Sequence, residues 1–197
     1  MKAFGWLVLA ALALGAWYYL LGGGAQLEKY AAESDAAKMS AFVSAFEAEN
    51  AGRFVSFTDP DYGFTVKYPI GFAADSEPVN GARLSATAMI SENLFEIINV
   101  MAYDRPFSSF ADDGSAAIEG FSLSNRRQIE IGGRAAVMFD STGVTPLGGG
   151  GMYGTLALVD CAYANGTRYV LGVAGAVSAP LSEDLRMMEY VTYSVTC

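Results

Sequence analysis

Hydrophobic and polar positions divide the chain into an apolar beginning, a helical middle and a β-rich remainder. Residues 3–27 carry no charge, and Phe4 to Leu21 is an apolar run of 18 residues. As a helix rising about 1.5 Å per residue, this run spans roughly 27 Å, close to the hydrocarbon thickness of a bilayer at about 30 Å. The pattern therefore predicts a single membrane helix within residues 1–25.

Aromatic and charged residues at the ends of this segment predict how it lies in a membrane. Amphipathic rings prefer the membrane–water interface, and the segment has them near both ends: Trp6, Trp17, Tyr18 and Tyr19. Lys2 precedes the apolar run, and the first charge after it is Glu28. Because positive charge favours the cytoplasmic side, we expect a single-pass protein of the cell membrane with residues 28–197 extracytoplasmic, either periplasmic or extracellular.

Two other interpretations of the first segment remain open. Gly23-Gly24-Ala25 offers small residues for cleavage before Gln26, as in a signal peptide. The apolar regions of signal peptides usually run about 7–15 residues, and this one is longer and ends in bulky aromatics, so we favour the uncleaved anchor. A prepilin-like signal is the weaker alternative, because Ala10 stands where such helices usually carry Glu.

Residues 26–52 follow the glycines that end the apolar segment, and their spacing predicts a helical stalk or linker. Apolar side chains at i, i+3, i+4 and i+7 share one helical face; here they are Met39, Phe42, Val43 and Phe46. Asn50-Ala51-Gly52 supplies a stop signal. We expect the apolar face to pack on the domain that follows, with a partner helix as the alternative.

Beyond this helix, apolar residues alternate with polar ones, which is typical of strands. The predicted strands are Phe64–Tyr68, residues 82–90 and 94–103, Arg127–Ile131, Arg134–Asp140, Thr155–Ala164 and Arg168–Ala176. Gly132-Gly133 and Asn165-Gly166-Thr167 have the composition of hairpin turns. Helices are predicted over Ser108–Glu119 and after Ser182. The fold class is therefore α+β: residues 53–197 form an antiparallel sheet of six or seven strands with flanking helices.

Charge and composition narrow the function of the outer part. The chain has 12 basic and 21 acidic residues, so without Lys2 the remainder has 11 against 21, a formal charge of −10. Nucleic-acid phosphates and anionic lipids both need a basic footprint, and we expect neither as a direct partner of this part. The sequence has no His, which excludes Ser/His and Cys/His catalysis. Catalysis by a carboxylate pair or a Ser/Lys arrangement stays open, although no spacing suggests one, and we expect no cofactor.

Cys161 and Cys197 are the two cysteines, and in an oxidising compartment they can form a disulfide. Closing a loop of about 37 residues would stabilise the fold by roughly 3–4 kcal/mol in the chain-entropy model; two separate thiols are the alternative. We expect no zinc site from this pair, because zinc normally takes four Cys or His ligands. Asn165 begins an N-x-Thr sequon that is a glycosylation candidate, although its role in the turn is sufficient to explain it.

Other motifs are interpreted as structural. Gly149–Gly154 matches G-x-G-x-x-G, but a predicted strand follows it where the dinucleotide fingerprint needs a helix. Three acidic pairs lack the spacing of a calcium loop, and we assign them to turns and helix N-termini. They are Asp59/Asp61, Asp112/Asp113 and Glu183/Asp184.

Two motifs in the β-rich part of the chain are distinctive. Phe57 to Pro69 has the sequence FTDPDYGFTVKYP, and Ile129 to Ala136 has the sequence IEIGGRAA. They resemble the PsbP-like family over roughly residues 54–197: the first is similar to the family's opening strand, GFS-x-x-YP, after a short turn, and the second to its I-x-I-G-G-x-x-A step. Phe72 stands where the family often has Trp. The best-known members are extrinsic subunits of photosystem II, but many relatives belong to non-photosynthetic prokaryotes, and no photosystem role is carried over.

The resemblance implies an α-β-α sandwich that serves as a binding or assembly module, and not as an enzyme. We therefore expect a membrane-anchored, extracytoplasmic interaction or accessory domain, which would bind a protein partner through an exposed apolar patch. One alternative is a structural subunit of a surface filament or membrane complex. Another is a small-molecule or metal-binding module, which would have a pocket with converging acids.

Overall fold

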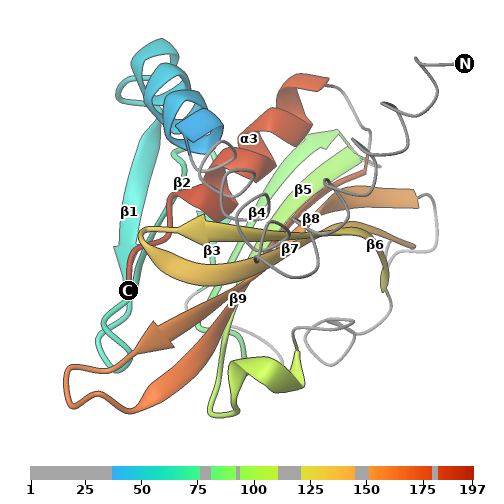
Figure 1. Ribbon diagram of the computed structural model, residues 1–197. Coiled ribbons are helices and arrows are strands. Elements are labelled where there is room, and N and C mark those ends of the chain that lie inside the picture. The colour runs from blue at the N-terminus through green and yellow to red at the C-terminus, as the bar shows by residue number, and fades with distance from the viewer. Residues whose placement is uncertain (1–36, 76–80, 92–93, 111–120, 145–150, 179–181) are drawn as a thin grey trace, which may run out of the picture. The chain divides into compact units, whose positions relative to one another are not determined.

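Figure 1 shows the computed structural model, which describes residues 37–75, 81–91, 94–110, 121–144, 151–178 and 182–197. The predicted membrane segment, with Trp6, Trp17, Tyr18 and Tyr19, lies outside these residues. Within the described ranges, no helix is both long enough and apolar enough to cross a bilayer. The chain divides into two compact units, Met1–Ser40 and Ala41–Cys197. Apart from residues 37–40, which begin the first helix, the features below belong to the second unit.

The second unit is built around a seven-stranded antiparallel sheet with the order β3-β4-β5-β9-β8-β7-β6 (Figure 1). Its strands are β3 (Ala73–Ala74), β4 (Leu84–Ser91), β5 (Leu94–Tyr103), β6 (Phe121–Ile131), β7 (Arg134–Val144), β8 (Gly151–Ala162) and β9 (Arg168–Val177). Successive side chains of a strand point to opposite faces, and the central strands are buried on both. The α+β class and the antiparallel sheet predicted from the alternation are confirmed.

A two-stranded sheet stands apart from the main one. It pairs β1 (Phe54–Thr58) with β2 (Thr65–Pro69). The sequence predicted a strand here but not its separate sheet. The alternation correctly placed Phe64 and Val66 inside, because both side chains are fully buried. After β2, the Ile70 amide donates to the Arg53 carbonyl at 3.0 Å, which closes the open end of this hairpin.

Two helices accompany the sheets: residues 37–49 are helical, and α3 spans Ser182–Tyr193. The ring of Phe46 stacks on Tyr190 with centroids 4.8 Å apart. Phe42 meets Tyr193 edge-on, with centroids 5.9 Å apart. The apolar face predicted for the first helix therefore packs on its own domain, as expected, and this helix ends at residue 49, next to the predicted stop signal.

The two faces of the main sheet are covered differently. α3 lies against β8 and β9 on one face (Figure 1). Gly175 of β9 permits this approach, because a Cβ there would lie 2.8 Å from Sδ of the buried Met188. On the other face, the short 3-10 helix η2 (Phe107–Ser109) precedes the buried Phe110. In the described residues, α-helix therefore covers one face and a short 3-10 helix lies on the other. Residues 111–119 of the helix predicted over Ser108–Glu119 lie outside the described residues.

Both predicted hairpin turns are confirmed. Gly132 and Gly133 have φ values of +57° and +75°, which a two-residue type I′ turn requires and glycine adopts most readily. Between β8 and β9, the Thr167 amide donates to the side-chain oxygen of Asn165 at 2.9 Å. The described part of the G-x-G-x-x-G match begins β8. A strand therefore stands where a dinucleotide site needs a helix.

Candidate functional site

A cavity of about 500 Å³ opens near the β4–β5 hairpin at one side of the sheet. The end of the helix over residues 37–49, the loop after β2 and the first turn of α3 complete its walls. Most of the wall is apolar and includes Phe46, Phe54, Ile70, Phe72, Ile90 and Met187. Four charged side chains also line it: Arg53, Glu96, Glu183 and Asp184. Its volume lies within the range of small-molecule sites, roughly 300–1,000 Å³.

Glu96 is the most buried of these charged side chains. It lies on β5 directly opposite Ala88 of β4 and Val177 of β9, so it points to the face that α3 covers. The residue is only 5% exposed. Among the described residues, no donor bonds to its carboxyl group and no cation pairs with it. The strand therefore places a carboxyl group inside a largely apolar wall without a partner.

The protonation of Glu96 follows from this environment. Burial, together with the smaller effect of the nearby Asp184 carboxylate, raises its pKa to about 7. The pKa of Asp184 is itself raised, first by burial and then by Glu183. Glu183 and Asp184 occupy the first turn of α3, the helix-terminal position predicted for this acidic pair. Near neutral pH, the cavity can therefore both donate and accept hydrogen bonds through carboxyl groups.

Two exposed apolar side chains lie at the mouth of the cavity. Ile70 and Ile90 line it and are 59% and 58% exposed. β3 pairs with β4 only through Ala73 and Ala74. In the part of the chain that the structure describes, the last residues of β4 therefore have no strand on their outer side. We call Ile70 and Ile90 the apolar rim.

Asp59 is a second buried carboxyl group, in the turn between β1 and β2, and it is 1% exposed. Its Oδ1 accepts hydrogen bonds from the amides of Asp61 at 2.9 Å and Tyr62 at 2.8 Å. The Nε of Arg83 donates to its Oδ2 at 2.8 Å. Burial alone would raise the pKa of Asp59, but the hydrogen bonds from Arg83 and the two amides outweigh it and lower that pKa. The first acidic pair thus has the turn role that the sequence predicted.

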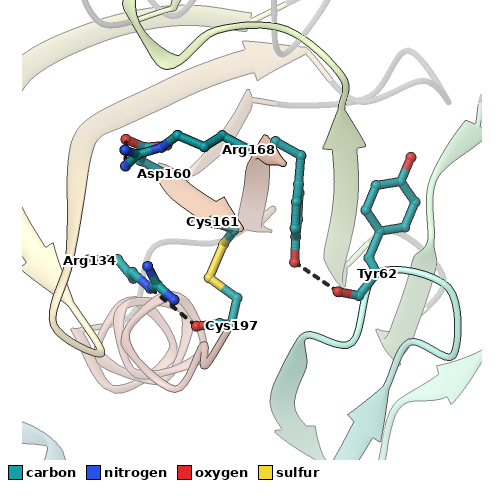
Figure 2. Close-up of a disulfide and its surroundings, with 7 residues drawn as sticks. Tyr62, Arg134, Asp160, Cys161, Arg168 and Cys197 are labelled. Atoms are coloured by element: carbon teal, nitrogen blue, oxygen red, sulfur yellow. Dashed lines mark hydrogen bonds and ion pairs between the residues drawn. A yellow bond between two sulfur atoms is a disulfide. The ribbon is translucent and has the colours of Figure 1, made fainter. Parts of the chain in front are cut away.

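The two cysteines meet at the edge of α3's face of the sheet (Figure 2). Cys161 of β8 is fully buried and is bonded to Cys197, with Cα atoms 5.6 Å apart. The Nε of Arg134 donates to the Cys197 carbonyl at 3.3 Å. Thr196 pairs with Thr65 of the two-stranded sheet. The segment after α3 is thereby tied to both sheets, and the expected cysteine pair lies at disulfide distance.

The residues named from the sequence and the residues of the cavity overlap little. Asn165 is exposed in the β8–β9 turn, and its glycosylation stays a prediction; Asp112/Asp113 lie outside the described residues. Glu96 was missed. One signal for it was present: in a strand of otherwise mostly apolar residues, Glu96 has the same alternation phase as Ile98 and Val100, both fully buried. A carboxylate in a buried phase is a candidate functional group.

Comparisons with known proteins support the fold. No protein-family model matches the sequence, and no curated protein matches it. The solution structure of cyanobacterial PsbP from Synechocystis has a TM-score of 0.51 and 11% identity, covering 73% of this chain and 92% of that one. LpqN is described as involved in cell envelope biogenesis of Mycobacterium tuberculosis. Its crystal structure has a TM-score of 0.51 and 13% identity, covering 78% of this chain and 95% of that one. The chain therefore has a PsbP-like fold.

Proposed function

We propose that the protein is a membrane-anchored, extracytoplasmic relative of the PsbP-like family, and that it is a non-catalytic interaction module. Its partner would bind over the cavity and its apolar rim. The observation that carries this proposal is the rim itself, because large apolar side chains lie exposed together there, at the mouth of a cavity with apolar walls. Such patches on soluble domains usually mark binding sites.

The chemistry of the cavity supports binding more than catalysis. Its described lining combines three carboxyl groups and one guanidinium with apolar side chains, and it includes no Ser, Thr, Cys, Lys or His side chain beside the carboxyl groups. The acids lie beside apolar walls, an arrangement that suits recognition of a group with matching shape and charge.

The proposed location rests on the sequence and on compartment chemistry. The uncharged run at residues 3–27 is long enough for a membrane helix. The bonded Cys161–Cys197 pair suits an oxidising compartment outside the cytoplasm. LpqN, which has a similar fold, is described as involved in cell envelope biogenesis, and we propose that the present protein lies in the cell envelope.

A site-specific photocrosslinker tests this proposal in native membranes. Placed at Ile90 on the rim, it should give a discrete adduct with one partner protein, identified by mass spectrometry. The matched control is the exposed Thr167, at the opposite end of β9 from Val177, which lies beside Glu96. The proposal fails if Ile90 yields no adduct, or if Thr167 yields the same one. Recovery of peptides from residues 3–25 in the same experiment tests whether the membrane segment is retained.

A further inference from the structure

We propose that the cavity beside β5 binds an organic cation: a primary ammonium or guanidinium group carried on an apolar stem. This inference rests on the proposed function, since it names the chemistry that the same face of the molecule would recognise.

The first step concerns the unpaired carboxyl group. Glu96 is 5% exposed and has no hydrogen-bonding or ionic partner among the described residues. A buried carboxylate without a partner is unfavourable unless it takes up a proton or gains a counter-charge. A cation that enters the cavity supplies this counter-charge. An anion would instead increase the unfavourable charge at this point.

The second step is the balance of charge around Glu96. Glu183 and Asp184 also line the cavity, so three carboxyl groups face one guanidinium, that of Arg53. Arg53 is exposed, and its Nη1 donates to the side-chain oxygen of Asn50 at 2.9 Å. The start of α3 would by itself attract an anion. Its first turn carries the two acids, however, and these offset that field.

The third step excludes a bare metal ion and favours an organic cation. Calcium takes 6–8 oxygen ligands and magnesium prefers octahedral oxygen coordination. No group of three or more carboxyl, thiol or imidazole side chains in the described ranges is placed to hold a metal. The walls instead offer aromatic and aliphatic side chains, among them Phe46, Phe54, Phe72 and Met187. Aromatic faces attract cations, and the remaining wall can cover an apolar stem.

The pH dependence of cation binding provides an independent test of the role of Glu96. Because the pKa of Glu96 is about 7, its carboxylate form predominates at pH 8 and its neutral form at pH 5.5. The other charged groups that line the same cavity are Asp184, Glu183 and Arg53. Binding of a cation should therefore strengthen at least several-fold from pH 5.5 to pH 8, and this change should disappear when residue 96 cannot ionise.

The test uses the full chain in lipid nanodiscs and compares three probes of one shape: 4-phenylbutylamine, 4-phenylbutanol and 4-phenylbutyrate. Binding is measured at pH 8 by ligand-observed NMR. The amine should bind at least tenfold more tightly than the alcohol, and the carboxylate more weakly still. Equal binding of amine and alcohol, or preference for the carboxylate, would overturn the proposal.

Two variants assign the effect to Glu96. E96Q keeps the shape of the side chain and should weaken amine binding at least tenfold. E130Q is the matched control. Glu130 is exposed on β6, so this substitution removes the same charge far from the buried carboxyl group. If the two variants bind the amine equally well, the cavity is not the site.

A last arm distinguishes the source of the cation. A blocked Leu-Lys-Leu tripeptide presents the same ammonium group as a side chain of a partner protein would. Tighter binding of the tripeptide than of the amine assigns the site to a basic side chain, and tighter binding of the amine assigns it to a free small molecule. If neither binds while the Ile90 crosslink persists, the cation inference fails and the proposed function stands. If the amine binds but Ile90 gives no crosslink, the proposed function fails and the cation inference stands.

Discussion

Two carboxyl groups are buried to nearly the same extent in this molecule, yet their surroundings differ. Asp59 in the β1–β2 turn is 1% exposed and Glu96 on β5 is 5% exposed. Two backbone amides and Arg83 donate hydrogen bonds to Asp59, whereas Glu96 has no partner among the described residues. Their pKa values accordingly move in opposite directions, down for Asp59 and up for Glu96.

The difference separates a structural acid from a functional one. Every described donor around Asp59 comes from the fold itself, so its charge is fully compensated before any ligand arrives. Glu96 faces a cavity, and what would compensate its charge has to come from outside. Burial alone therefore does not indicate what a carboxyl group does; the satisfaction of its hydrogen bonds does.

Replacing Asp59 should give the largest effect. The variant D59A leaves two amides without their acceptor and Arg83 with Asp61 alone, and we expect a loss of about 3–5 kcal/mol in the free energy of unfolding. Urea denaturation measures it. The control is D61A, whose side chain is 70% exposed and also pairs with Arg83; it should cost less than about 1 kcal/mol. Similar losses for both would show that the turn does not depend on Asp59.

Replacing Glu96 should increase the free energy of unfolding at high pH, whereas replacing Asp59 should decrease it. Its pKa in the folded protein, about 7, lies above its ordinary value of 4.5, so the folded state binds the proton more tightly. Between these two pH values, the stability contributed by this group is lost as pH rises, by on the order of 2–3 kcal/mol.

E96Q should therefore be more stable than the wild type at pH 8 by a similar amount, and about equally stable at pH 4.5. Asp184, whose pKa is also raised, adds a change of the same sign in both proteins. Urea denaturation at the two pH values measures the difference. A loss of stability in E96Q at pH 8 would mean that the wild-type carboxylate has a stabilising partner.

A conservative change at Arg83 sharpens the account of Asp59. The guanidinium reaches both oxygens of Asp59, from Nε at 2.8 Å and from Nη2 at 3.2 Å. R83K keeps the charge but cannot keep this fork, so we expect a loss of about 1–2 kcal/mol. The pKa of Asp59, followed by NMR, should rise. An unchanged pKa would show that the amides alone hold the charged form.

The smallest effect on stability is expected at the rim. Ile90 is 58% exposed, so I90S should change the free energy of unfolding by less than about 1 kcal/mol. Ile98 is fully buried, and I98S should cost several-fold more, as a matched control. Calorimetry measures both. A large loss in I90S would mean that the rim is needed for folding and is not reserved for a partner.

Local pattern was enough to predict much of the fold. The hairpins at Gly132-Gly133 and Asn165-Gly166 were found because such turns need positive φ values, which Gly132, Gly133 and Gly166 have. The buried phase of Phe64 and Val66 followed from alternation, but the separate sheet did not, because strand partners depend on contacts distant in sequence. The cysteine pair was suggested by count alone, and its proximity required the folded chain.

The cavity could not be predicted in the same way. Its walls come from a helix end, a loop, a hairpin and the start of α3, which are separated along the sequence. No spacing rule joins such segments. The one local signal was Glu96, a charged residue in the phase of Ile98 and Val100. The acidic pair at the start of α3 was predicted to have a helix-terminal role. Only the fold shows that both acids also line the cavity that Glu96 lines.

The order of strands in the main sheet has a consequence for how the site is assembled in time. Strands β6 to β9 follow one another as neighbours, so this half can form through short-range pairings. The pairing of β5 with β9 instead joins segments on either side of that whole meander, with Glu96 opposite Val177. Closing such a long loop is slow compared with forming hairpins. The cavity then comes into existence only when this seam closes, and a bound ligand would hold the seam shut.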